Sequence, residues 1–371
     1  MIKSLEGGRG IAALIVALYH LKIGIDHFST IRNGYIFVDL FFVLSGFVIC
    51  AAYSQRLRTL TDCQSFLIRR FGRLFPLLVF STVFYVAAAN IIVFAKRMAI
   101  AHGFGASLNN PGALDYLIPN SLEIVSTLTM THGLGVFDTL ILNTPSWSIS
   151  TEFYAYLLFA ALCFVLRGWL RLVAFAMLAC IGFAVSVAAS INVHNCIETG
   201  GCLSLTFDYG FPRTVFSFFM GALTWHLSRR VSVHANALQT IGFAALAATL
   251  MAVDADHAVA FAFPFIFALL ILAVCKDSGW LAAILKTRPC QVLGERSYSI
   301  YMMHMPLVLF FENAAKRVDG VIPSTLVLLL YVLTLVVVSG WTYRFIEDPF
   351  RAMFNRIAAR RSQTAIHPAR G

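Results

Sequence analysis

The chain has 371 residues, of which 59% are hydrophobic and only 12% are charged, with a formal net charge of +10. Soluble domains carry about 25% charged residues, so this composition and the mean hydropathy of +0.79 exclude a soluble multi-domain protein. The basic residues cluster beside the apolar segments, as membrane topology requires, which argues against nucleic acid as a partner.

Ten apolar segments, long enough for helices of about 20 residues, predict an all-α polytopic membrane protein. We place the ten transmembrane helices at 9–25, 36–54, 74–95, 147–166, 170–190, 209–228, 236–253, 258–275, 297–314 and 324–344. With both termini in the cytoplasm, 21 of the 28 Lys and Arg residues lie on inside segments, six lie on outside loops and Arg213 lies within a span. This positive-inside bias supports the count and the orientation.

The remaining segments carry polar and helix-breaking residues. We interpret the stretch 115–135 as interfacial or re-entrant, and Pro349 as the end of the last helix at the inner surface. Residues 1–355 are then one transmembrane domain. The basic cytoplasmic tail, 356–371, is expected to be disordered or to lie on anionic membrane lipids.

The eight cysteines contain no pair of CxxC motifs, and the histidines have no partner at metal-ligand spacing, so we assign no metal. Cys196 and Cys202 share an outside loop. A small disulfide loop is expected there if that side is oxidising, and free thiols are expected if it is not.

The first span begins with Arg9 and reaches His20 after ten residues that are apolar except for Tyr19. Eleven steps of about 100° bring His20 within roughly 20° of Arg9, about 16 Å further along a helix, so both side chains face the same way. Ionisable groups inside a membrane are costly and are therefore functional candidates. The alternative is a snorkelling Arg9 and a hydrogen-bonded core histidine.

Asp39 lies about as far after the first outside loop as His20 lies before it, so the two are expected at similar depth. A carboxylate beside an imidazole fixes its tautomer and stabilises the imidazolium, as in general-base catalysis; hydrogen bonding near a helix start is the alternative. Glu152 enters from the same side, five residues into the span that Trp147 opens at the interface. It is expected to position an acceptor hydroxyl, to support the histidine or to pair with a basic group.

Two further patterns concern the cytoplasmic side and the ninth span. Arg70 and Arg73 are helix neighbours three residues apart, which suits phosphate binding as well as ordinary positive-inside anchoring. Tyr298, Tyr301 and His304 form one polar stripe on an otherwise apolar helix. The stripe suits a substrate channel, and a polar contact between helices is the alternative.

Five stretches in order resemble the membrane-bound acyltransferase-3 family of bacterial integral membrane enzymes. They are Leu5-Glu6-Gly7-Gly8-Arg9-Gly10-Ile11-Ala12 with His20; Phe37-Val38-Asp39-Leu40-Phe41-Phe42; Arg70 with Arg73; Trp147-Ser148 with Glu152; and Ser297-Tyr298 through His304, closing with Tyr343, Glu347 and Pro349. One departure is Gly8, where many relatives have a larger apolar residue. The resemblance implies a ten-helix enzyme of the bacterial inner membrane that takes acyl groups from cytoplasmic acyl-CoA. It also implies that Arg9 and His20 are central to catalysis and that Arg70 and Arg73 serve the donor.

Together these observations predict O-acyl transfer from acyl-CoA, with acetyl-CoA the first candidate and no bound cofactor, to a hydroxyl of a surface polysaccharide or its lipid-linked precursor. His20 is the predicted general base, with Asp39 as its partner, or is itself acylated. The predicted acceptor path comprises Trp147, Ser148, Tyr298, Tyr301 and His304, with Glu152 beside Trp147 in the outer half. A small secondary metabolite is the alternative acceptor, and a transporter or lipid flippase is the alternative class of protein.

Overall fold

The computed structural model describes residues 2–21, 23–25, 27–103, 114–231, 234–315 and 323–366, with the side chains of 362–366 excepted. This part of the chain is helical, with short 3-10 and π segments, and holds no strand. Parts of the first predicted span, 9–25, and of the predicted tail, 356–371, lie outside the described residues.

Each predicted span corresponds to one long helical segment, and most bounds differ by a few residues. The long helices are α1 (Lys3–Leu21), α3 (Phe37–Tyr53), α4 (Leu60–Ala101), α6 (Trp147–Val165), α7 (Gly168–Asn192), α9 (Gly210–Ser228), α10 (Ala235–Ala252), α11 (Phe263–Val274), α14 (Ser297–Ala315) and α15 (Ser324–Thr342). Short elements connect or extend them: α2 (Ser29–Arg32), η1 (Gly34–Ile36), α5 (Ser121–Leu128), η3 (Thr144–Ser146), α8 (Cys196–Thr199), η4 (His257–Ala262), α12 (Trp280–Leu285) and α13 (Arg288–Glu295). The helix within 115–135 is α5, whose eight residues are too short to cross a membrane.

Within the described residues, seven helical segments are long and apolar enough to cross a membrane. The long helices α1, α9 and α14 are absent from that set. They carry the ionisable residues Arg9 and His20, Arg213, and His304. The chain is therefore a polytopic all-α membrane protein, while the count of ten spans and the cytoplasmic termini stay predictions.

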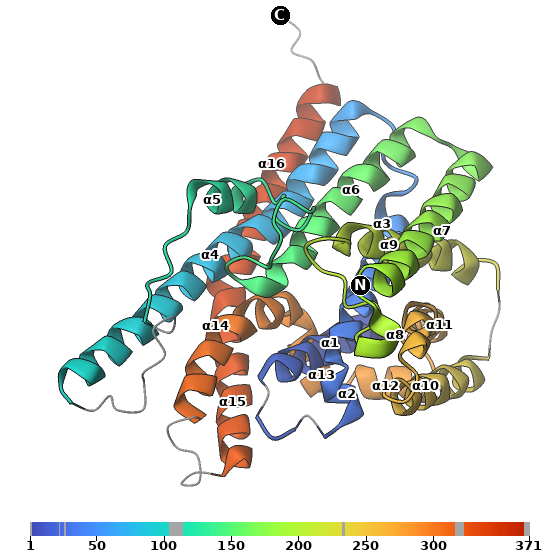
Figure 1. Ribbon diagram of the computed structural model, residues 1–371. Coiled ribbons are helices and arrows are strands. Elements are labelled where there is room, and N and C mark those ends of the chain that lie inside the picture. Colours follow the sequence, from blue (N-terminus) through green and yellow to red (C-terminus); the bar gives the residue numbers. More distant parts are fainter. Residues whose placement is uncertain are drawn as a thin grey trace, which may run out of the picture.

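One expectation about the C-terminal end is wrong: the π-helix η5 (Tyr343–Glu347) joins α15 to α16 (Asp348–Ile366), so the helix continues through Pro349. Of the two alternatives for the tail, disorder does not hold for residues 356–366, which are helical, and contact with anionic lipid stays a prediction. Pro349 is tolerated because it directly follows the π-turn η5, where the regular hydrogen-bond ladder of the helix is already interrupted. Figure 1 shows α16 lying along α4, and Ala358 is buried in this contact. Tertiary packing therefore orders a segment whose basic composition suggested disorder.

α1 lies against α13 at a distance that only glycine allows, and α14 begins at Ser297, directly after α13. A Cβ atom on Gly10 would lie 2.4 Å from the backbone nitrogen of Gly294, and a Cβ on Gly294 would lie 2.3 Å from the carbonyl oxygen of Glu6. Small residues at such interfaces let helix backbones approach closely in membranes. The contact sets the position of α1 beside α14, whose polar stripe His20 must reach.

Glycine residues also allow a close backbone contact between α3 and α9. A Cβ atom on Gly46 would lie 1.8 Å from the carbonyl oxygen of Phe218, and one on Gly221 would lie 1.8 Å from that of Val43. Because α3 and α9 pack backbone to backbone, short polar side chains on one helix can reach groups on the other.

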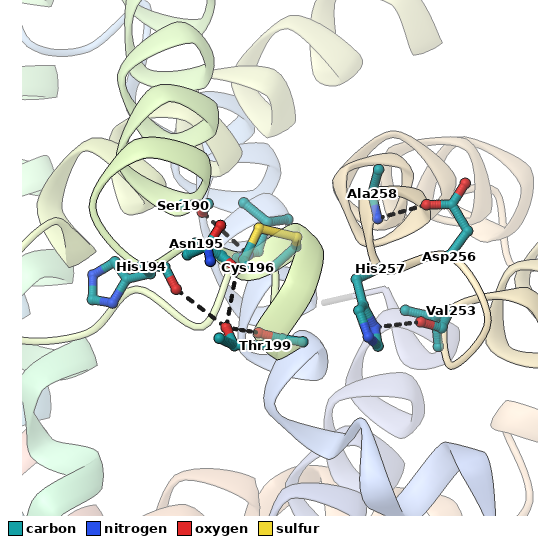
Figure 2. The surroundings of a disulfide bond; sticks show 12 residues. Ser190, His194, Asn195, Cys196, Thr199, Val253, Asp256, His257 and Ala258 are labelled. Carbon is teal, nitrogen blue, oxygen red and sulfur yellow. Dashed lines mark hydrogen bonds between the residues drawn. A yellow bond between two sulfur atoms is a disulfide. The ribbon is translucent and has the colours of Figure 1, made fainter.

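Cys196 and Cys202 form a disulfide, which answers the question that the sequence left open. Figure 2 shows the bridge beside the turn in which the hydroxyl of Thr199 donates to the carbonyl oxygen of His194. The bridged segment is anchored to η1, because the hydroxyl of Tyr35 donates to the carbonyl oxygen of Cys202 at 3.1 Å.

We predict that Gly10→Ala lowers the thermal midpoint of the detergent-solubilised protein, because the new methyl group cannot fit against Gly294. Overpacking of this kind costs about 1–3 kcal/mol. Gly8→Ala is the matched control on the same helix, since the nearest atom to its Cβ lies 4.0 Å away. Gly8→Ala should leave the midpoint unchanged or raise it, because alanine favours helix. Equal midpoints for the two variants would contradict the close contact.

Candidate active site

One cavity gathers all three predicted arginines between α1, α3, α4, α6 and α14. We call it the arginine cavity; its volume is about 220 Å³, and its lining consists of Arg9, Val38, Phe41, Phe42, Leu44, Ser45, Val48, Ile49, Arg70, Arg73, Leu74, Ser148, Ile149, Glu152, Tyr156, Ser297, Tyr298 and Tyr301. Arg9 is fixed by donating to the hydroxyl of Ser297 at 3.0 Å. The guanidinium of Arg70 lies over the ring of Tyr53, and in the described part of the chain its buried Nε has no hydrogen-bond partner. The cavity is therefore positively charged and has an N–H group that could donate a hydrogen bond to a ligand.

Glu152 lies in the arginine cavity, which corrects its expected place beside Trp147. Its carboxylate accepts hydrogen bonds from Ser45 at 2.6 Å and from Tyr156. Five residues along a helix amount to about 500° of rotation, so Trp147 and Glu152 point about 140° apart. Ser148 is four residues before Glu152 and therefore shares its face.

A second cavity, of about 210 Å³, contains the ring of His20. We call it the histidine cavity, and its lining consists of Tyr19, His20, Tyr35, Val38, Leu140, Thr144, Pro145, Trp147, Ser204, Thr206, Arg213 and Tyr301. Besides His20 and Tyr301, the lining contains three aromatic side chains that carry a polar atom, those of Tyr19, Tyr35 and Trp147. The segment that follows the disulfide supplies Ser204 and Thr206, so the bridged loop borders this cavity.

Val38 and Tyr301 line both cavities and form the wall between them. The hydroxyl of Tyr301 lies 2.8 Å from that of Ser148 and donates to the carbonyl oxygen of Pro145 at 3.2 Å. The predicted stripe on α14 crosses this wall. Tyr298 lines the arginine cavity and donates to the carbonyl oxygen of Leu74, whereas His304 lies behind the histidine cavity against His20.

A second histidine lies against the ring of His20. Nδ1 of His20 lies 3.2 Å from Nε2 of His304 and 2.9 Å from the carbonyl oxygen of Val16. The ring of Tyr19 meets that of His20 edge-on, with centroids 4.8 Å apart. His304 is fully buried.

Asp39 does not pair with His20, and this part of the prediction is wrong. Both carboxylate oxygens of Asp39 accept hydrogen bonds from the guanidinium of Arg213, with a shortest distance of 2.7 Å. The hydroxyl of Ser217 also donates to the Asp39 carboxylate, at 2.8 Å. Neither charged side chain is more than 1% exposed. A buried arginine needs a fully desolvated counter-charge, and Asp39 supplies it across the α3–α9 contact. The role of Asp39 is therefore to hold Arg213.

The comparisons with known proteins agree with this architecture. The model of the acyltransferase domain that defines the acyltransferase-3 family matches residues 2–344. The chain belongs to the acyltransferase-3 family. It is 27% identical to the putative peptidoglycan O-acetyltransferase YrhL of Bacillus subtilis over 97% of the chain and 56% of that relative. It is 23% identical to the peptidoglycan O-acetyltransferase OatA of Listeria monocytogenes, and 25% identical to the O-acetyltransferase OatA of Staphylococcus aureus, each over 94% of the chain.

The chain spans little more than half the length of these relatives, 56% of the Listeria protein and 57% of the Staphylococcus protein. No solved structure matches it. In the described residues, no three His, Cys, Asp or Glu side chains gather as metal ligands would.

Two site residues of this acyltransferase-3 chain were missed or undervalued in the sequence. Arg213 was given no role, although it was the single basic residue assigned to a span interior, which was the available signal. Glu347, which closes the last of the five family stretches, was given no role of its own, yet it is buried, accepts a hydrogen bond from Ser299 at 2.9 Å and ends the π-helix η5. π-Helical turns occur frequently at functional sites because they turn a side chain out of the regular register.

We predict that Asp39→Ala lowers the thermal midpoint strongly, because it leaves Arg213 buried without its counter-charge. Breaking a buried pair costs about 3–5 kcal/mol. The double variant Asp39→Ala/Arg213→Ala should be more stable than Asp39→Ala alone, because the uncompensated charge is gone. A double variant whose destabilisation is the sum of the two single effects would contradict the pairing.

Proposed function

We propose that this chain transfers an acetyl group from cytoplasmic acetyl-CoA to a hydroxyl of a cell-envelope glycan. The observation that carries the proposal is the pair of cavities: one lined by three arginines and one containing His20, with Tyr301 in the wall between them. A donor in the first and an acceptor in the second would meet at that wall.

The arginine cavity suits the acyl end of acyl-CoA. Arginine binds phosphate through paired N–H groups, and Arg70 has an uncommitted Nε among its described contacts. Sites that enclose a whole drug-sized ligand span about 300–1,000 Å³. A cavity of about 220 Å³ therefore suits the acetyl-pantetheine arm, with the adjoining diphosphate against the arginines and the adenosine end of CoA outside the cavity.

The histidine cavity suits a sugar. Tyr19, Tyr35 and Trp147 offer flat apolar faces with polar edges, which match the mixed apolar and hydroxyl surface of a carbohydrate ring. Trp147 is itself backed by the guanidinium of Arg213, 5.7 Å from the ring centroid. Because Arg213 is neutralised by Asp39, the cavity favours a hydroxyl-rich acceptor over a strongly anionic one.

The chemistry follows from this arrangement. His20 takes the proton of the acceptor hydroxyl, whose oxygen attacks the thioester carbonyl carbon, so that a C–O bond forms and the C–S bond breaks. The imidazolium then returns the proton to the thiolate of CoA. The product ester leaves from the histidine cavity, and CoA leaves from the arginine cavity.

The relatives support a glycan acceptor, since two of those compared above are named peptidoglycan O-acetyltransferases. We carry that substrate class to this chain as part of the proposal, with peptidoglycan or its lipid-linked precursor as the first candidate. The disulfide between Cys196 and Cys202 supports an oxidising, extracytoplasmic side for the loop that borders the histidine cavity. The proposed location is the bacterial cytoplasmic membrane, with the donor inside and the acceptor outside.

A transporter or flippase also needs polar residues inside a helical bundle. Two separate cavities, with positive charge in one and a histidine in the other, favour group transfer over passage of a single substrate. Acyl transfer also accounts for the arginines, which a flippase for a neutral glycan would not require.

We predict that His20→Ala abolishes acetyl transfer, because the hydroxyl loses its general base. The expected loss is about 10²- to 10⁴-fold. Membranes that contain each variant are given acetyl-labelled CoA, and both CoA release and label in the glycan fraction are followed. The control is His102→Ala, whose exposed imidazole contacts only its own helix end among the described residues. Full transfer by His20→Ala would remove His20 from the chemistry and favour the transporter.

We predict that Arg70→Gln raises KM for acetyl-CoA about tenfold or more, because a charge-assisted hydrogen bond is worth about 1.5–3 kcal/mol. The matched control is Arg69→Gln, the preceding residue on α4, whose side chain does not line the arginine cavity. KM for the glycan should stay constant in both variants. A similar rise in KM for acetyl-CoA in Arg69→Gln would indicate general membrane-surface attraction instead of a donor site.

A further inference from the structure

Three ring nitrogens and two carbonyl oxygens define the surroundings of the contact between α1 and α14 at His20. Nδ1 of His20 lies 2.9 Å from the carbonyl oxygen of Val16 and 3.2 Å from Nε2 of His304. Nδ1 of His304 lies 2.5 Å from the carbonyl oxygen of Tyr301. The ring of His304 is fully buried, whereas that of His20 lines the histidine cavity.

These contacts assign the protons, because a carbonyl oxygen only accepts hydrogen bonds. Nδ1 of His304 carries the proton of its neutral ring, so its Nε2 is an acceptor. Nδ1 of His20 also carries a proton, which faces both the carbonyl oxygen of Val16 and Nε2 of His304. The basic nitrogen of the neutral His20 ring is then Nε2.

We infer that His304 is a positioning residue that, together with the carbonyl oxygen of Val16, holds the ring of His20 in the orientation and tautomer with a basic Nε2. The inference rests on the proposed function, in which His20 removes the proton from the acceptor hydroxyl. As Nε2 takes that proton, the ring becomes an imidazolium whose Nδ1–H still donates to His304. A hydrogen bond from a charged donor is about twice as strong as a neutral one, so the contact strengthens as the hydroxyl oxygen attacks.

A neutral side chain is a suitable hydrogen-bond partner for His20 at this buried position. A carboxylate in the same place would have to be desolvated without a counter-charge whenever His20 is neutral, and burial of an isolated charge is costly. His304 avoids that cost and is itself oriented by a backbone carbonyl of its own helix. It therefore takes over the task that the sequence assigned to Asp39, which is committed to Arg213.

The test compares variants of position 304 in the full chain, in membranes supplied with acetyl-labelled CoA and the glycan acceptor. His304→Leu should lower kcat about 10- to 100-fold, as loss of an orienting partner of a catalytic histidine does, while KM for acetyl-CoA stays unchanged. His304→Gln should keep most of kcat, because its amide oxygen can accept from Nδ1 of His20. His304→Asn has the same amide on a shorter side chain and should behave like His304→Leu.

Two comparisons separate positioning from packing. In a His20→Ala background, His304→Leu should lower the residual transfer no further, because the two residues act as one unit. Tyr331→Phe removes another buried hydrogen bond to α1, from the Tyr331 hydroxyl to the carbonyl oxygen of Ala17, and should keep the wild-type kcat. Folding of every variant is checked by its thermal midpoint, and the Gln and Asn pair decides the matter if His304→Leu does not fold.

Equal loss in His304→Gln and His304→Asn, a further fall in the His20→Ala background, or a wild-type kcat in His304→Leu would each overturn the inference. A low kcat in Tyr331→Phe would also overturn it, since any disturbance of α1 would then suffice. The proposed function fails in a different way, through absence of acetyl transfer in the wild type or full transfer by His20→Ala.

Discussion

The site depends on one packing constraint, the backbone approach of α1 to α13, the helix that leads directly into α14. Gly10 and Gly294 leave no room for a side chain between the helices. At that separation a single α1 face delivers Arg9 to Ser297 at one end and His20 to His304 at the other. A helix set back by the width of a methyl group would lengthen both contacts beyond hydrogen-bonding distance. The glycine-rich start of the chain is therefore a condition for the proposed chemistry, although no glycine lines either cavity.

A second buried contact holds the segments that border the histidine cavity. The ion pair between Asp39 and Arg213 joins α3 to α9, and Arg213 also donates to the carbonyl oxygens of Tyr35 and Leu205. These carbonyls belong to η1 and to the segment after the disulfide, which border the histidine cavity. A buried ion pair contributes little net stability but strongly disfavours arrangements that separate its members. Here it fixes three chain segments around one cavity.

Much of this could be predicted from the sequence, because hydropathy and helical spacing are local properties. The helices at the predicted spans, the shared face of Arg9 and His20 and the stripe from Tyr298 to His304 all follow from the hydropathy and the period of a helix. Partners could not be predicted in the same way. The depth of Asp39 matched that of His20, but depth does not fix rotation about the helix axis, and Gly46 and Gly221 turn Asp39 toward Arg213. Glu152 was misplaced for a similar reason, since its distance from Trp147 along the chain was used without the rotation. The course of α16 depends on packing against α4, which no local pattern reveals.

The wall between the cavities also bears on how such an enzyme works in a membrane. A continuous polar channel would let water reach the thioester and let ions cross the bilayer. Val38 and Tyr301 separate the arginine cavity from the histidine cavity, and the hydroxyl of Tyr301 is retained by Ser148 and by the carbonyl oxygen of Pro145. In the proposed reaction, only the reacting atoms need to meet at the wall, because the donor and the acceptor each occupy their own cavity. Exclusion of water at that point would strengthen every hydrogen bond to the developing charge and suppress hydrolysis of the thioester. The separation of the two cavities is therefore part of the proposed mechanism.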